Sequence, residues 1–192
     1  MNKKVTTNQI VMTGLFLALE IILQVIGNNV HFGPVSINLS LVAVVLAAVV
    51  CGPLSGAILG FFNGLLVIFA PSTLAIFMPV NPIGTVFACF GKCTIAGIVA
   101  GLVNKLISKK NKTAGLTVSS ILVPVINTGL FLVFALMFFQ TWISANVGAE
   151  AAFKNVGEFL IVGVVGWNFL IEVAVTCFLS VTAGLIILRS KK

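Results

Sequence analysis

The sequence predicts an all-α fold, an integral membrane bundle of six transmembrane helices. The chain of 192 residues is 59% hydrophobic and only 8% charged, and its mean hydropathy is +1.21. This composition leaves too few polar side chains to cover a soluble globule. Because one crossing takes about 20 apolar residues, the length allows about six helices with short connections, in a single domain over residues 1–192.

The six expected helices follow the apolar segments of the chain. They cover about residues 9–26, a second and a third segment that end near residues 51 and 69, and then about 83–106, 116–140 and 158–188. Between the third and fourth segments, Pro71, Pro79 and Pro82 break regular helix, which predicts an outer connection able to fold back into the bundle. Pro124 predicts a kink in the fifth segment.

The cations lie at the ends of these segments and indicate the topology. They form three groups: Lys3 and Lys4; Lys105, Lys109, Lys110 and Lys112; and Arg189, Lys191 and Lys192. With six crossings all three groups fall on one face, which the positive-inside rule makes cytoplasmic. Both termini are therefore expected on the cytoplasmic side, and the net charge of +7 does not indicate nucleic-acid binding.

Lys92 is the first indication of what the protein binds. It lies roughly nine residues inside the fourth segment, and a lysine at such depth costs roughly 3 kcal/mol. Gly84, Gly91, Gly97 and Gly101 narrow one side of this segment. Lys92 is therefore expected to face protein or a cavity rather than lipid.

Further polar residues are expected to converge with Lys92 in the outer half of the bundle. They are Asn63, Asn81, Asn127, Trp167 and Asn168. A lysine suits a carboxylate or phosphate, amides suit hydroxyl or peptide-like groups, and Trp167 would cover an apolar part of a small ligand. The competing interpretation is that Glu20 or Glu172 neutralises Lys92 and that the asparagines only join helices.

Two shorter stretches each leave two interpretations open. The first outer loop, residues 27–40, carries His31 and Asn38 and is either solvated or a lid over the substrate. In the first segment, Gly14 and Ala18 form a small-x-x-x-small step that lets another helix approach closely in lipid. This step serves either packing within the chain or docking of another subunit.

Enzymatic chemistry is not indicated. His31 is the only histidine, no carboxylates have a catalytic spacing, and Cys89 and Cys93 are better explained as small core residues than as metal ligands. The sequence around Lys92 superficially resembles a P-loop, but its glycines are wrongly spaced and no strand precedes it. We expect no metal and no cofactor, and any ATP hydrolysis must come from other subunits.

Three motifs follow one another in an informative order. They are Gly14-x-x-x-Ala18, Pro34-Val-Ser-Ile-Asn38 and Cys51-Gly-Pro-Leu-Ser-Gly-Ala57. Together with the size and the six helices, they make nearly the whole chain similar to the substrate-binding S components of energy-coupling factor (ECF) vitamin transporters. Gly14 stands where that family's Ala-x-x-x-Ala motif usually has alanine.

The resemblance implies a function and its partners. An S component of the bacterial plasma membrane captures a vitamin from outside and docks through its first helix onto a membrane T subunit coupled to two cytoplasmic ATPases. It is thought to topple within the membrane to release its cargo. Helices four to six and the first loop usually build the binding site, which is where the polar residues above are expected.

The resemblance is greatest to the pantothenate type. It rests on Asn81-Pro-Ile-Gly-Thr85, Gly91-Lys92 and Pro124-Val-Ile-Asn-Thr-Gly129. Pantothenate offers a carboxylate for Lys92 and an amide and hydroxyls for the asparagines, while the absence of tyrosine disfavours riboflavin and thiamine. Alternatives are an S component for riboflavin, thiamine, folate or pyridoxine, a membrane assembly protein that binds nothing small, and a small autonomous transporter.

Overall fold

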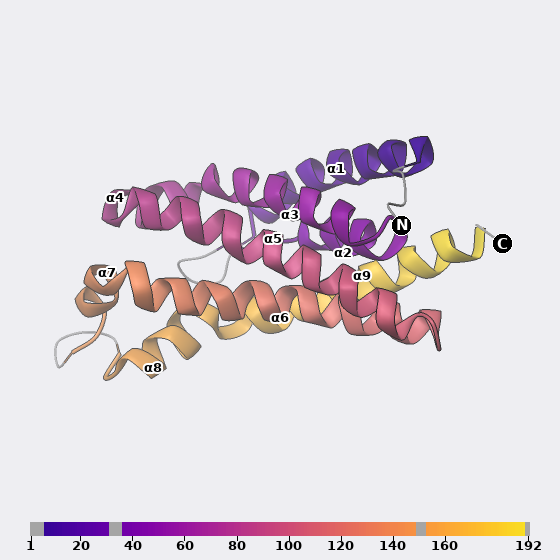
Figure 1. Cartoon of the computed structure of the whole chain (residues 1–192). Coiled ribbons are helices and arrows are strands. Elements are labelled where there is room, and N and C mark those ends of the chain that lie inside the picture. Colours follow the sequence, from indigo (N-terminus) through magenta and orange to yellow (C-terminus); the bar gives the residue numbers. More distant parts are fainter. Residues whose placement is uncertain (1–5, 31–35, 149–152, 191–192) are drawn as a thin grey trace.

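The computed structural model describes residues 6–30, 36–148 and 153–190. Within these ranges the regular secondary structure is helical, apart from one isolated β-bridge (Figure 1). In chain order the elements are α1 (Thr7–Gly27), α2 (Leu41–Val50), α3 (Pro53–Ile68), η1 (Thr73–Phe77), α4 (Met78–Val80), α5 (Pro82–Ile107), α6 (Lys112–Phe138), α7 (Gln140–Ala145), α8 (Val156–Glu158), η2 (Phe159–Val165) and α9 (Gly166–Ser190). The two η elements are π-helical. The expected all-α fold is confirmed.

The long helices have the length and composition of membrane spans. Four qualify: α1, α5, α6 and the continuous stretch Val156–Ser190. A fifth span results if α3 and the Thr73–Val80 stretch, which are bent by 65° relative to each other, are counted together. The helix α2 is apolar but has only 10 residues. Within the described residues the structure thus contains four or five candidate spans.

Local sequence explains where the long helices begin. Thr6 and Gln9 form a reciprocal capping box at the start of α1. Asn81 caps α5, because its Oδ1 accepts the Gly84 N–H at 2.8 Å. Pro82 follows in the first helical position, where its missing N–H costs nothing. Asn111 caps α6 in the same way.

Glycines bring α3 and α5 together backbone to backbone. A Cβ on Gly56, Gly60 or Gly64 of α3 would lie 2.5, 2.3 or 2.8 Å from a carbonyl oxygen of α5. The residues facing them on α5 are Gly97 and Cys93 as well as Cys89. Close approach through small residues is the usual way for helices to associate in lipid, where packing replaces the hydrophobic effect. This contact fixes α5, and with it Lys92, against α3.

The short helix α2 occupies the centre of the bundle. Every residue from Leu41 to Ala48 is buried, and α2 contacts α1, α3, α5, α6 and α9. The chain has already entered the interior before this helix begins, since Ile37 and Ser40 are 2% and 0% exposed. The loop between α1 and α2 therefore delivers polar residues into the bundle.

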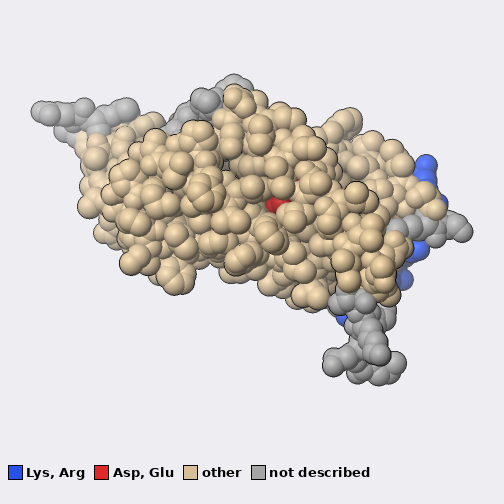
Figure 2. Space-filling view, turned by 90° about the horizontal axis from the view of Figure 1, so that it is seen from above, with Lys and Arg blue, Asp and Glu red and all other residues tan. Residues whose placement is uncertain are grey.

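The two ends of the bundle differ in charge. The N-terminus of α1, the connection between α5 and α6, and the C-terminus of α9 lie at one end (Figure 1). Figure 2 shows Lys and Arg side chains gathered at that end of the displayed face. The α4, α7 and α8 elements lie at the opposite end (Figure 1). Aromatic rings pack in this part of the molecule: the ring centroids of Phe77 and Phe139, of Phe77 and Trp142, and of Trp142 and Phe159 are each 5.0 Å apart.

Candidate functional site

A cavity of about 80 Å³ lies between α5, α6, η1 and the α9 helix with its preceding η2 turn. Its polar lining includes Gln24, Asn38, Lys92, Asn127, Asn168 and Glu172. Phenylalanine rings from η1 and α6 and the residue after α6 supply much of its apolar lining. Because one buried water needs about 10–15 Å³, the cavity has room for several water-sized groups. Its mixed lining suits a small molecule that is polar in some parts and apolar in others.

Lys92 is buried and faces this cavity. Its side chain is only 8% exposed, and its Nζ lies 5.0 Å from the centroid of the Phe131 ring, a cation–π contact. Among the residues that the structure describes, no carboxylate forms an ion pair with Lys92 within 4.0 Å. The expectation that Lys92 faces protein or a cavity is confirmed. Glu172 does interact electrostatically with Lys92, so the competing interpretation, in which Glu172 neutralises Lys92, stays open.

Hydrogen-bonded amides connect the cavity wall to the helices behind it. Asn38 Nδ2 donates to Asn63 Oδ1 at 2.9 Å, and Asn63 Nδ2 donates to Ser40. Ser40 Oγ is 2.7 Å from Gln24 Oε1 on α1. The Cys93 thiol on α5 lies within hydrogen-bonding distance of Asn63, at 3.1 Å. These contacts tie α1, α3 and α5 to the start of α2, so the wall is held by a network rather than by single contacts.

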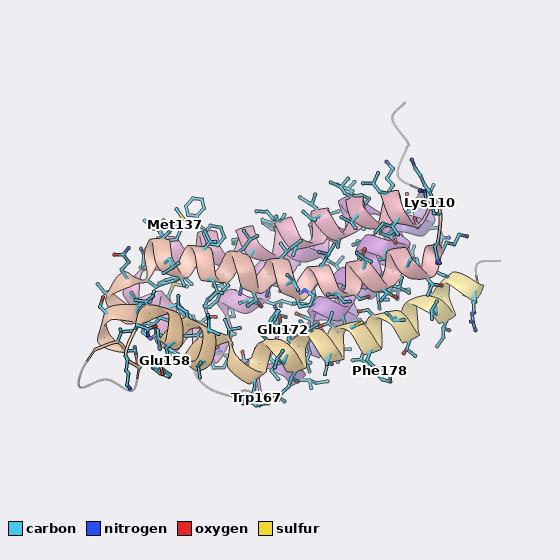
Figure 3. All side chains as sticks on the ribbon, turned by 90° about the horizontal axis from the view of Figure 1, so that it is seen from below. Lys110, Met137, Glu158, Trp167, Glu172 and Phe178 are labelled. Carbon is cyan, nitrogen blue, oxygen red and sulfur yellow. The ribbon has the colours of Figure 1, made fainter. Side chains whose placement is uncertain are left out.

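Glu172 brings a carboxyl group to the cavity from α9. Its Oε2 accepts the backbone N–H of Asn38 at 3.1 Å, whereas its Oε1 is buried and has no hydrogen-bond partner of normal geometry. Figure 3 shows Glu172 on the inner side of α9, toward α6, while Trp167 lies on the outer side. Lys92 and Glu172 line the same cavity and interact electrostatically across it.

The structure brings together four of the eight residues expected at a binding site. Asn38, Lys92, Asn127 and Asn168 all line the cavity. Asn63 is fully buried behind the wall, where it bonds to Asn38.

Asn81 and Trp167 do not line the cavity. Asn81 caps α5, and its Nδ2 donates to the Phe138 carbonyl at 3.2 Å. Trp167 is 73% exposed and does not line the cavity, so it is not positioned to cover a ligand there. His31 lies outside the described residues. The structure thus gives Asn81 a structural role and leaves His31 undecided.

Several lining residues were not found from the sequence. Gln24 enters from α1, and Phe77 and Phe139 form part of the apolar wall together with Phe131. Gln24 could have been suspected as a second polar residue on the inner face of the first helix, one turn after Glu20. The phenylalanines carried no signal, since the chain has 16 of them. Only packing selects which of these rings reach the cavity.

The small-residue step on α1 faces outward. Gly14 and Ala18 are both exposed, and a Cβ on Gly14 would meet nothing within 4 Å. The buried residues of the same helix, Phe16, Glu20 and Gln24, lie on the other side. Gly14 therefore does not mediate close helix packing within the described part of this chain.

The fold and the cavity define a helical membrane protein that can hold one small polar molecule inside its bundle. The family model for the ECF transporter substrate-specific component matches residues 8–187. The chain therefore belongs to this family, whose members are transporter subunits, and is a multi-pass protein of the cell membrane. Association with membrane T and ATPase components and a small-molecule substrate follows from this membership. Searches among curated proteins and among solved structures found no significant match.

Proposed function

We propose that this chain is the vitamin-specific binding subunit of an ATP-driven ECF importer and that its ligand is pantothenate. The observation that carries the proposal is Lys92, a buried cation without an ion-pair partner among the described residues, at the wall of a cavity. A charge kept in the membrane interior is costly unless it is compensated. The carboxylate of a ligand would supply the compensation.

The remaining lining matches the rest of pantothenate. Its central amide and its hydroxyls need donors and acceptors, and the amides of Asn127 and Asn168 line the cavity from α6 and α9. Its apolar dimethyl group needs a dry surface, which Phe77 and Phe139 offer. This assignment of polar and apolar groups is what favours pantothenate over a fully aromatic vitamin.

The proposed topology has six crossings with both termini in the cytoplasm. The sixth crossing is α2, whose 10 residues span only about 15 Å and which is extended by the buried segment that precedes it. Support comes from the position of both ends of the described chain at the basic end of the bundle (Figures 1 and 2). An even number of crossings and the positive-inside rule then place that end inside the cell.

The proposed docking surface for the T subunit is the outer face of α1. Gly14 and Ala18 are exposed there and flanked by large apolar residues such as Val11 and Leu15, which are 54% and 60% exposed. A small step within an apolar helix face permits close approach of a partner helix. The two ATPases would then act through the T subunit.

The binding proposal is tested with the Lys92→Ala variant. Truncation of one partner of a buried charge pair costs about 2–5 kcal/mol, so we expect pantothenate to bind at least about 30-fold more weakly. Isothermal titration of the purified protein in lipid nanodiscs measures this. Lys105→Ala is the matched control, because Lys105 is an exposed lysine on the same helix. Normal affinity of the Lys92→Ala variant would remove Lys92 from the binding site.

The docking proposal is tested with the Gly14→Leu variant. We expect it to bind pantothenate normally but to lose most ATP-dependent uptake when it is produced together with its T subunit and ATPases, because the leucine fills the docking step. The matched control is Gly129→Leu, since Gly129 on α6 is also exposed and also has nothing within 4 Å of its Cβ position. Equal uptake by both variants would contradict docking at Gly14.

A further inference from the structure

Glu172 is left with an unused acceptor in the cavity wall. The side chain is 7% exposed, and of its two oxygens only Oε2 has a hydrogen bond, from the backbone of Asn38. Oε1 is buried without a partner of normal geometry. A buried polar atom without a hydrogen bond is costly, and more so when it is charged. An ionised carboxylate accepts only, so what is lacking is a donor.

Two of the amides that line the cavity donate to other residues. The Asn38 Nδ2 group donates to Asn63, and the Gln24 Nε2 group donates to Asn28. Asn127 lies in side-chain hydrogen-bonding range of Glu172, but the contact lacks normal geometry and leaves Oε1 unsatisfied. A ligand group that donates to Glu172 would replace or reinforce this poor contact.

The chemistry of these two side chains specifies that group. The Oδ1 of Asn127 lies 3.3 Å from the Cys93 sulfur, whose single S–H is shared with Asn63 at 3.1 Å, and the amide N–H₂ is the part of Asn127 that can donate toward Glu172. A hydroxyl can accept from this amide and donate to Glu172 at the same time. An ammonium group cannot do so, because it would meet the amide with donors on both sides.

We propose that Glu172, assisted by Asn127, binds a hydroxyl group of the same ligand whose carboxylate is held by Lys92. This inference rests on the proposed function, which it narrows to a class of substrate: a small hydroxy acid with its carboxylate toward α5 and a hydroxyl toward α9. Glu172 is thus a specificity-determining residue. A site that hydrogen-bonds a substrate hydroxyl rejects the analogue that lacks it, because the buried acceptor is then left unpaired.

The test is a thermodynamic cycle that combines one change in the protein with one change in the ligand. The affinities of the wild-type protein and the Glu172→Gln variant are measured by titration in nanodiscs for pantothenate and for its two analogues that each lack one hydroxyl. Glutamine keeps a carbonyl oxygen for the Asn38 N–H, so the start of α2 stays in place, but it turns a donor toward the cavity. Glu20→Gln is the matched control, because Glu20 is the other fully buried glutamate of the described chain and does not line the cavity.

We expect the losses of binding affinity caused by the protein change and by the ligand change to be non-additive. One deoxy analogue should bind the wild-type protein about 10- to 100-fold more weakly than pantothenate. Glu172→Gln should weaken pantothenate by a similar factor and should not weaken that analogue further. Glu20→Gln should retain the wild-type discrimination. Unchanged pantothenate affinity in Glu172→Gln, or losses that add fully for both analogues, would overturn the inference.

The same measurements separate this inference from the choice of vitamin. If pantothenate does not bind the wild-type protein, the cycle is run with whichever of pyridoxine, riboflavin, folate and thiamine raises its melting temperature, paired with the analogue that lacks one donor. A dependence on Glu172 in that case supports the inference and removes pantothenate. If binding depends on Glu172 but not on Lys92, only the assignment of the ligand carboxylate to Lys92 is contradicted. Failure of every vitamin to bind overturns both proposals.

Discussion

In one half of the bundle, the rigid half, α3 and α5 touch through glycines and carbonyl groups, whereas the other half, formed by η1, α6, η2 and α9, contributes large aromatic rings and two π-helical turns to the cavity wall. In the first half, small side chains leave no space, so the helices cannot shift without a clash. In the second half, Thr73–Phe77 and Phe159–Val165 both depart from regular α-helix and both contribute to the cavity wall. The comparison indicates a rigid scaffold on one side of the cavity, which holds Lys92 in place, and a less regular wall on the other side, and π-helical turns are frequent at functional sites.

The largest effect is expected from a leucine at Gly60, in the rigid half. The Cβ position of Gly60 is 2.3 Å from the Cys93 carbonyl oxygen, which belongs to the backbone and cannot move aside. We expect Gly60→Leu to separate α3 from α5 and to cost about 3 kcal/mol or more, so that little folded protein is recovered. Fluorescence-detected size-exclusion chromatography of the solubilised membranes measures the recovery.

The control for this variant is again Gly129→Leu. Its site is open, and leucine has a helix propensity about 1 kcal/mol more favourable than glycine, so the control should fold at least as well as the wild-type protein. If Gly60→Leu and Gly129→Leu were recovered and melted alike, the close contact between α3 and α5 would not exist in the membrane.

A smaller effect is expected from Phe139→Ala, in the half with the cavity. The Phe139 ring is 1% exposed, lies 5.0 Å from the Phe77 ring and lines the cavity. Loss of a buried phenylalanine costs about 3 kcal/mol where the site cannot collapse, but here the neighbouring π-helical turns can partly close the space. We therefore expect a folded protein with a clearly lower melting temperature and weaker ligand binding.

Ligand dependence sharpens this second prediction. A ligand that binds only the folded state raises stability by mass action, so saturating pantothenate should restore part of the melting temperature of Phe139→Ala. It should not recover Gly60→Leu. Rescue of the glycine variant by ligand would show that the two halves are not distinct in the way described.

The sequence was sufficient for most of the rigid half. Apolar length and the caps at Thr6, Asn81 and Asn111 place the starts of α1, α5 and α6 to within a few residues. Burial of Lys92 follows from the cost of exposing it to lipid. The glycines of α3 occur at every fourth position from Gly56 to Gly64, a pattern that is typical of close helix contact. The count of six crossings and the topology stay predictions.

The half with the cavity was less predictable, because there the helices are irregular. The last segment reads as one apolar helix, yet it contains a π-helical turn that ends at Gly166. A π-helical turn changes the number of residues per turn, so the face on which Trp167 lies cannot be extrapolated from the preceding residues. Likewise, α6 is continuous through Pro124, and the kink that the proline predicted stays a prediction. Asparagines such as Asn63 and Asn127 have no pattern that distinguishes bonding between helices from bonding to a ligand.

The smallest effect is expected at Gly166 itself, where the irregular half departs furthest from helical geometry. Its backbone has φ of +33° and ψ of −136°, a conformation that costs residues with a Cβ about 1–3 kcal/mol. No atom lies within 4 Å of a Cβ placed there, so the cost of Gly166→Ala comes from the backbone alone. We expect a decrease in melting temperature of a few degrees, since about 1 kcal/mol corresponds to 2–4 °C in a chain of this size. Gly129→Ala, an open glycine within α6, should instead be neutral or slightly stabilising. A Gly166→Ala variant as stable as Gly129→Ala would mean that the helix runs through this position without a break, and the contrast between the two halves would then rest on the aromatic packing and the cavity alone.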